Sequence, residues 1–335
     1  MDSRGLIDLQ VNGYAGVDFN DAALDAAALD HALEAMLRSG VTTCLPTLIT
    51  APESVLAERL AALDHAVATS GLGPAMVPGF HLEGPFLNPA PGFAGCHPPN
   101  AMVPPDPALL RRLTAALARP VLILTLAPEQ SGAVALARAA RAQGMLVAIG
   151  HSAADASVLA QAAEAGAALS THLGNALPRM MAKFRNPLVA HLAEDRLAAS
   201  FIADGIHIPP PALKVMLRAK GLDRAVLITD ATAAAATQPG VYCFAGMPIE
   251  HSENGAVHVP GGTRLAGSAL CLDQAVRNIA NWGFASPADA VRLASTNPAA
   301  LLAPALAAHG LRLTEGRIRW SATLVPENVR LDRAG

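Results

Sequence analysis

Histidines and carboxylates recur in this sequence at the ends of short apolar runs. His81 and Glu83 end one run. His151, His172 and Asp230 each follow another. Two imidazoles and one carboxylate are a typical ligand set for a catalytic divalent metal that keeps one position open for water. Glu83, His151 and His172 are therefore candidate metal ligands. Asp230 has no paired arginine in the sequence and suits a general base for a metal-activated water.

The apolar runs have the composition of buried strands, and stretches with helical spacing such as Ala22–Arg38 lie between them. The runs lack clean alternation of polar and apolar residues, as expected when helices cover a parallel sheet. Eight alternations of strand and helix predict an α/β fold, a (β/α)8 TIM-like barrel, rather than an open doubly wound sheet. The expected strands are Leu6–Val11, Val41–Leu45, Val77–Leu82, Val121–Leu126, Leu146–Ile149, Ala168–Thr171, Ala198–Ala203 and Ala225–Thr229.

The carboxyl ends of barrel strands share one rim, so the polar residues that end the runs are expected to converge there. Thr50 and Pro52 predict a helix start, with Thr50 as the N-cap. Beyond the eighth run, Gly240–Leu265 is typical of hairpins and Arg317–Leu331 of residual strand. Between these two regions the sequence predicts three helices, Leu272–Trp282, Pro287–Ser295 and Pro298–Leu302.

Composition narrows the class of protein. The chain has 335 residues, 52% of them hydrophobic, with a net charge of −3 and no basic cluster, so nucleic acid and anionic membrane are poor partners. The four cysteines lie far apart without a Cys-x-x-Cys pair, which favours a reducing, cytoplasmic location. No signal peptide is recognisable at the start, and no apolar run approaches the roughly 20 residues that span a bilayer.

Six short motifs and the opening segment Leu6–Gly13 resemble those of one family, in the same order. The chain resembles the N-acetylglucosamine-6-phosphate deacetylases of the amidohydrolase superfamily over about residues 5 to 303. The resemblance implies metal-dependent hydrolysis of an acetamido group, an activity similar to EC 3.5.1.25, on an amino-sugar substrate. The motifs are His81–Leu87, Gly150–Ser152, Thr171–Leu177, Ala203–His207, Thr229–Ala231 and Leu265–Ala269.

The family's roles carry over to matching positions. The resemblance implies that Glu83, His151 and His172 bind metal and that Asp230 is the catalytic aspartate. It also implies four substrate-binding positions: His207 near the acetamido group, His97 at the sugar, and Asn175 and Ala176 in a turn that holds the substrate.

Three departures from the family matter. Gln10 and Asn12 stand where many relatives carry His-x-His, and neutral amides are poor ligands for zinc or iron. We therefore expect one divalent metal ion per subunit, with zinc or iron favoured. Lys183, with Arg185 nearby, stands in place of an arginine that grips the sugar phosphate, and a lysine lacks the bidentate fork.

The third departure concerns a small β-domain, which is expected to be much reduced or absent. We expect a barrel domain over residues 1–303 and a C-terminal remnant of the small domain over 304–335. The resemblance further implies a homodimer. Two alternatives stay open: a sister amidohydrolase acting on an unphosphorylated N-acetyl sugar or another N-acyl amide, and a catalytically inactive binding barrel. Loss of a metal ligand or of Asp230 would indicate the inactive barrel, and none is lost.

Overall fold

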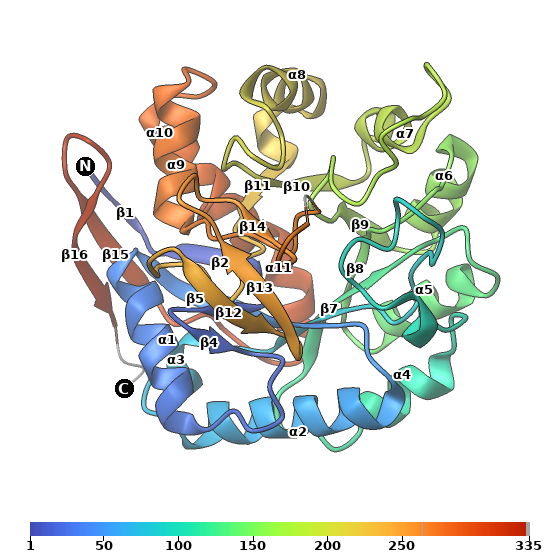
Figure 1. Cartoon of the computed structure of the whole chain (residues 1–335), viewed down its shortest axis with the longest axis horizontal. Helices are drawn as coiled ribbons and strands as arrows, with labels where there is room; N and C mark the ends of the chain where they lie inside the picture. Colours follow the sequence, from blue (N-terminus) through green and yellow to red (C-terminus); the bar gives the residue numbers. More distant parts are fainter. Residues whose placement is uncertain (263, 333–335) are drawn as a thin grey trace.

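The computed structural model describes residues 1–262 and 264–332, and eight parallel strands lie side by side at its centre (Figure 1). Nearly all residues of these strands are buried, because helices cover the outer face and side chains fill the interior. The predicted (β/α)8 barrel is confirmed. In spatial order the strands are β11 (Ala225–Ile228), β10 (Ala198–Ile202), β9 (Ala167–Ser170), β8 (Leu146–Ile149), β7 (Val121–Leu126), β6 (Phe80–Glu83), β5 (Val41–Ile49) and β2 (Leu6–Val11).

The barrel closes between β2 and β11 mainly at its C-terminal rim. The Asp230 backbone N–H donates to the Gln10 carbonyl at 2.9 Å, and the Asn12 N–H donates to the Ala231 carbonyl at 2.7 Å. Val11, the last residue of β2, forms an isolated parallel bridge with Ala231, three residues beyond the end of β11. The polar residues of the rim are therefore tied together where the first and last strands meet.

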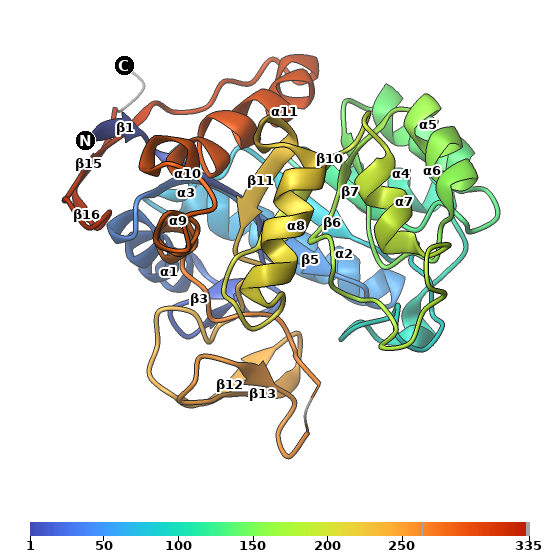
Figure 2. The same ribbon diagram turned by 90° about the horizontal axis from the view of Figure 1, so that it is seen from above.

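Helices surround the strands on the outside, as the view from above shows (Figure 2). Several begin at a side-chain cap: Asp25, Asp106 and Asp155 each accept a hydrogen bond from a backbone N–H in the first turn of the helix that follows. The helices are α1 (Ala26–Arg38), α2 (Glu53–Thr69), α3 (Gly73–Met76), α4 (Pro107–Thr114), α5 (Ala133–Ala142), α6 (Ala156–Glu164), α7 (Pro187–Ala193), α8 (Pro210–Lys220), α9 (Leu272–Asn281), α10 (Pro287–Leu293) and α11 (Thr296–Ala308).

Several element bounds differ from those predicted; β5 extends to Ile49 rather than Leu45, and α11 extends to Ala308 rather than Leu302. Helix α1 begins at Ala26 rather than Ala22, because Asp25 is its N-cap. Strand β6 begins at Phe80, after a Pro-Gly pair that cannot continue a strand. Thr50 does not cap α2; Pro52 occupies that position without a side-chain hydrogen bond, and Thr50 contacts a histidine instead.

Smaller sheets flank the barrel. The N-terminal β1 (Asp2–Arg4) pairs with β15 (Gly316–Trp320), which pairs with β16 (Pro326–Leu331), so both ends of the chain form one three-stranded sheet. The predicted hairpin region forms β12 (Gly240–Phe244), β13 (Met247–His251) and β14 (Val257–His258), which stand away from the barrel in Figure 2. Strands β3 (Gly13–Tyr14) and β4 (Val17–Asp18) form a two-stranded ribbon. The division after residue 303 stays a prediction. None of the described helices is both long and apolar enough to cross a bilayer.

Candidate active site

The strand-end residues converge on one rim and share an unusual backbone conformation. His151, His172 and Asp230 each lie two residues beyond the end of their strand. Their φ angles are +52°, +31° and +49°, in the left-handed region that residues other than glycine rarely adopt. Such strain persists only where the surrounding structure holds it, and it clusters at functional sites. The turns at these three positions aim the side chains across the barrel mouth.

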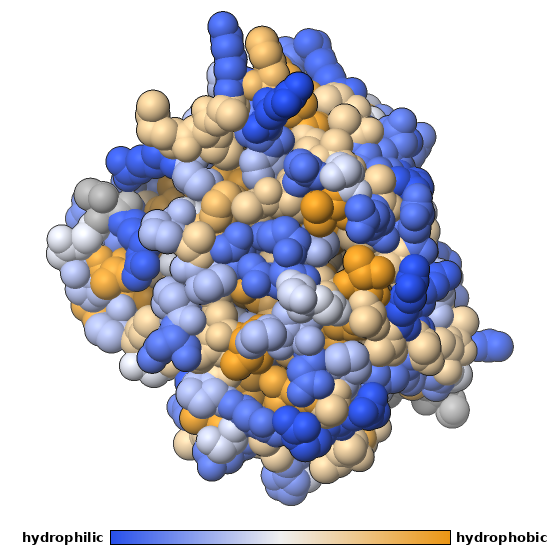
Figure 3. All heavy atoms as spheres, turned by 90° about the vertical axis from the view of Figure 1, so that its right-hand side faces the viewer, coloured by the Kyte–Doolittle hydropathy of each residue, from blue (hydrophilic) through white to orange (hydrophobic). Residues whose placement is uncertain are grey.

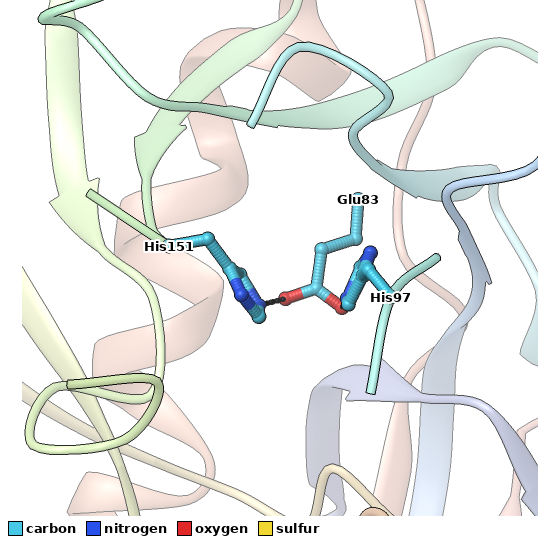
Figure 4. Close-up of side chains that lie close together, drawn as sticks. All are labelled: Glu83, His97 and His151. Carbon is cyan, nitrogen blue, oxygen red and sulfur yellow. Dashed lines mark ion pairs between the residues drawn. The ribbon is translucent and has the colours of Figure 1, made fainter. Parts of the chain in front are cut away.

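Glu83, the last residue of β6, lies at the centre of this group and is 2% exposed. His97 and His151 approach its carboxylate from opposite sides (Figure 4). Nε2 of His151 lies 3.3 Å from Oε1 of Glu83, and Nε2 of His97 lies 3.4 Å from Oε2. Burial alone raises the pKa of Glu83, but its contacts with the surrounding imidazoles outweigh it and hold the pKa well below its usual range. The carboxylate is therefore ionised and available as a ligand.

His151 presents a free lone pair to the centre of the site. Its Nδ1 lies 2.7 Å from the Phe93 carbonyl oxygen. A carbonyl only accepts, so Nδ1 carries the proton and Nε2 is the acceptor nitrogen of the neutral ring. This Nε2 is buried and has no hydrogen-bond partner among the described residues. An imidazole fixed in this way is the arrangement that proteins use for a metal ligand.

His97 has the opposite tautomer. The Thr50 backbone N–H points at its Nδ1 at 3.3 Å, and the Thr50 hydroxyl lies 2.9 Å from the same nitrogen. An N–H group can only donate, so Nδ1 accepts and Nε2 carries the proton of the neutral ring. Burial lowers the pKa of His97 to about 4, which keeps the ring neutral. His97 therefore donates to Glu83, although its Nε2, Glu83 and His151 all lie within 4.8 Å of one another.

His172 completes the group around Glu83. Its Nε2 lies 2.9 Å from Oε1 of Glu83, and its backbone N–H donates to the Ser200 hydroxyl at 2.8 Å. Burial disfavours the charged ring, but the contact with Glu83 outweighs it and raises the pKa of His172. His81, two residues before Glu83 on the same strand face, lies deeper and contacts the Leu9 carbonyl and the Thr125 hydroxyl, so it does not join the group.

Asp230 faces the group from the far side of the barrel mouth. Its Oδ1 accepts from the side-chain amide of Asn12 at 2.8 Å and from that of Gln10 at 3.3 Å. The Gln10 amide also donates to Oε1 of Glu83 at 2.9 Å. Burial, and then the negative charge of Glu83, raise the pKa of Asp230. A carboxylate with a raised pKa is better suited to accept and return a proton near neutral pH.

His207 lies in the loop after β10 and is held by Asp204. Its Nδ1 lies 2.6 Å from Oδ2 of Asp204, and its backbone N–H donates to Oδ1 at 2.8 Å. Burial alone raises the pKa of Asp204, but His207 outweighs it and the net pKa is lowered. Because Nδ1 is bound to a carboxylate, Nε2 is the nitrogen left for a substrate.

Glu129, which sequence reasoning passed over, joins two segments that carry residues of the site. Glu129 accepts from the Asn88 side-chain amide, the Ser152 hydroxyl and the Ala153 N–H at 2.7–2.8 Å. It therefore ties the loop that carries His97 to the turn that carries His151. Glu129 follows the predicted strand Val121–Leu126, so strand-end inspection of that run could have found it.

The remaining predicted substrate residues lie on the segment after β9. The Asn175 side-chain amide donates to the His172 carbonyl at 2.9 Å, and Ala176 has a φ of +50°. Lys183 and Arg185 lie farther along this segment and are exposed. The Lys183 ammonium lies 5.7 Å from the Phe184 ring centroid. Among residues 1–262 and 264–332 neither cation forms an ion pair, and the structure connects neither to the group around Glu83.

Known proteins match most of the chain. The Amidohydrolase family matches residues 5–304. An N-acetylgalactosamine-6-phosphate deacetylase of Escherichia coli O157:H7 is 36% identical over 296 residues, which cover 88% of this chain and 76% of that protein. An N-acetylglucosamine-6-phosphate deacetylase of Bacillus subtilis is 32% identical over 297 residues, covering 88% and 74%.

A solved structure extends the likeness to the fold. The N-acetyl-D-glucosamine-6-phosphate deacetylase of Mycobacterium smegmatis, a mutant in complex with N-acetyl-D-glucosamine-6-phosphate, matches with a TM-score of 0.87 and 29% identity. The match covers 98% of this chain and 85% of that one. The barrel fold is thus shared with enzymes of one reaction class.

Proposed function

The chain belongs to the amidohydrolase family and, within it, to the N-acetylglucosamine-6-phosphate deacetylases, and from this premise we propose that it hydrolyses the acetamido group of an N-acetylhexosamine 6-phosphate. The products are the amino sugar phosphate and acetate. The observation that carries the proposal is the buried ligand group: Nε2 of His151 is a free lone pair beside ionised Glu83, and Asp230 faces both.

The residues fit a divalent metal. Glu83 Oε1, His151 Nε2 and His172 Nε2 supply one carboxylate and two imidazoles, and Nε2 of His151 is a buried acceptor with no hydrogen-bond partner among the described residues. A divalent ion held there would lower the pKa of a water molecule and polarise the acetyl carbonyl. We propose one ion per chain, zinc or iron(II), because the Gln10 and Asn12 amides already donate to Glu83 and Asp230.

The side chains around this centre have complementary tasks. Asp230 takes the proton of the attacking water and returns it to the leaving amine, which its raised pKa assists. His207, oriented by Asp204, bonds the acetamido oxygen through Nε2 as negative charge develops there. His97, which donates to Glu83, borders the sugar together with Asn175 and Ala176.

We propose that the 6-phosphate of the sugar binds at the segment after β9. Lys183 and Arg185 are exposed cations on this segment, and a cation near a phosphate gives charge-assisted hydrogen bonds. Met180 is 88% exposed and Phe184 is 73% exposed on the same segment. Large apolar side chains at this exposure indicate an interface, so we propose a homodimer in which this segment is covered by the neighbouring subunit. At the upper edge of Figure 3, hydrophobic and hydrophilic side chains stand side by side.

The free thiols of the protein support a location in the cell. All four cysteines are free, and two of them are partly buried and one fully buried. Free thiols are typical of proteins that work in a reducing compartment, and we propose the cytoplasm.

Acetate release tests the proposed reaction. The substrates are the 6-phosphates of N-acetylglucosamine and N-acetylgalactosamine and the two unphosphorylated sugars, each with added zinc, iron(II), cobalt or manganese. We expect turnover of at least one phosphorylated sugar and a lower KM than for its unphosphorylated form. Lys183→Ala should raise the KM for the phosphorylated sugar and leave the other nearly unchanged.

Two outcomes would change the assignment. Equal kcat/KM for phosphorylated and unphosphorylated sugars would mean that the phosphate is not recognised, and would favour a sister amidohydrolase acting on a neutral N-acyl amide. No acetate from any of the four sugars with any metal would contradict deacetylation of hexosamines.

A further inference from the structure

A further carboxylate, Asp8, lies inside the barrel below the rim and has no task in the reaction described above. It is 0% exposed. Its partners are backbone N–H groups and one hydroxyl, and among the described residues no cation pairs with it. Burial raises its pKa to about 7. A buried carboxyl without a counter-ion is costly, so its hydrogen bonds must hold something that the protein needs.

The bonds of Asp8 join the first and last barrel strands. The Thr229 hydroxyl donates to Oδ2 at 2.5 Å, and the Thr229 N–H donates to Oδ1 at 3.2 Å. The Gln10 N–H donates to the same Oδ1 at 3.3 Å. One carboxylate therefore fixes two backbone positions that are 219 residues apart along the chain.

Both backbone positions adjoin the catalytic groups. Thr229 precedes Asp230, and its hydroxyl also accepts from the Ala231 N–H at 3.1 Å, so Asp230 is held on both sides. Asp230 has a φ of +49°, a conformation that needs such support. Gln10, held at its N–H, extends a side-chain amide that donates to both Glu83 and Asp230.

We propose that Asp8 is a positioning residue that keeps Asp230 in its left-handed conformation and aims its carboxylate at the reaction centre. The link passes through Thr229 on one side and through Gln10 on the other. Asp8 touches neither substrate nor metal ligand in this scheme. The inference rests on the proposed function, because it assumes that Asp230 exchanges the proton.

Asp8→Asn and Thr229→Val test the link. Both substitutions keep the volume of the side chain. Asp8→Asn replaces the accepting carboxylate by an amide, and Thr229→Val removes the hydroxyl that donates to it. We expect each to lower kcat about 10- to 100-fold, the range found for groups that orient catalytic ligands, with KM changed less than about twofold. Metal content should stay at one equivalent, and Thr229→Ser should restore kcat.

A matched control is Asp64→Asn. Asp64 is also a buried carboxylate, 8% exposed, that accepts two backbone N–H bonds, from Ala118 and Arg119, away from the rim. This variant should lose thermal stability but keep its kcat. A kcat loss equal to that of Asp8→Asn would show a general effect of destabilisation and overturn the proposal.

The decisive comparison is between the Asp230→Asn variant and the double variant that also carries Asp8→Asn. If Asp8 acts through Asp230, adding Asp8→Asn to that variant should lower kcat no further. A multiplicative loss, or wild-type kcat in Asp8→Asn or Thr229→Val, would overturn the positioning role while the proposed function stands. A wild-type chain inactive on every sugar would overturn the proposed function instead. The crystal structure of Asp8→Asn then decides the inference, since an unchanged φ at Asp230 would contradict it.

Discussion

At the scale of single residues, the partners of each imidazole decide what it can do. His151 and His97 both flank Glu83, yet a carbonyl at Nδ1 leaves His151 with a free Nε2, whereas an N–H at Nδ1 makes the Nε2 of His97 a donor. The same side chain is therefore suited to metal binding in one place and to hydrogen-bond support in the other. The partners of Asp230 are amides instead: its Oδ1 accepts from the side chains of Asn12 and Gln10.

Replacement of the base should separate turnover from metal binding. Asp230→Asn should keep the fold and the metal and lose about two to four orders of magnitude in kcat, because an amide cannot accept the proton of water. His151→Ala, by contrast, should lose both metal and activity. Elemental analysis and acetate-release kinetics on the same samples check both. A near wild-type kcat in Asp230→Asn would mean that another group is the base.

The pH profile should show the raised pKa of Asp230. The base acts only when ionised, so activity is lost as the pH falls through its folded-state pKa. Burial and Glu83 raise that pKa above the ordinary 3.8, so the acidic limb of kcat/KM should lie above this value. Samples held at each pH and assayed again at pH 7 separate titration from acid unfolding. A limb at or below 3.8 would contradict the assignment.

At the scale of elements, one buried lysine holds the end of α7, the helix that follows the segment proposed to bind the phosphate. Lys220, the last residue of α8, is 0% exposed. Its ammonium donates at 2.8 Å to the carbonyl of His191 in α7 and to that of Glu194, the C-cap of α7. These carbonyls have no partner within their own helix, so the lysine satisfies the end of α7 and joins it to α8.

Removing that ammonium should destabilise the fold. Lys220→Met keeps the length of the side chain but leaves the His191 carbonyl without its donor and the Glu194 carbonyl with the Leu197 N–H alone, which should lower the free energy of unfolding by about 1–3 kcal/mol. Arg218→Met, at an exposed position of the same helix, is the matched control and should change it by less than about 0.5 kcal/mol. Urea unfolding at pH 7 measures both. Equal stability of the two variants would show that Lys220 contributes nothing through its donors.

At the scale of the whole molecule, the exposed apolar side chains are unevenly placed. Met180, Met181 and Phe184 gather on the segment between β9 and α7, beside the cations Lys183 and Arg185. The barrel wall behind them is closely covered by helices (Figure 2). The proposed dimer interface therefore lies on the same segment as the two cations proposed to bind the sugar phosphate.

We expect a mass in solution of twice 34.3 kDa at micromolar concentration. Met180→Ser combined with Phe184→Ser should shift the chain towards monomer and raise the KM of the phosphorylated sugar, because less apolar area is buried. Val241→Ser, on the hairpin and 69% exposed, is the control and should remain dimeric. Light scattering after size-exclusion chromatography measures the mass. A fully active monomeric wild type would contradict the dimer.

The sequence alone predicted the strands, the barrel and the rim residues. These depend on local information: apolar runs of strand length, helical spacing between them, and a polar residue where each run ends. Glu83, His151, His172 and Asp230 all meet at the rim, because parallel strands place their carboxyl ends together.

Only the tertiary structure decided what those residues can do. The left-handed turns at His151, His172 and Asp230 depend on contacts from distant strands, which no local pattern encodes. The tautomer of His97 depends on Thr50, predicted as a helix cap, and the support of Asp230 depends on Asp8, 221 residues away from Thr229. Spacing along the chain predicts which side chains reach the rim, but hydrogen-bond direction depends on neighbours that only folding brings together.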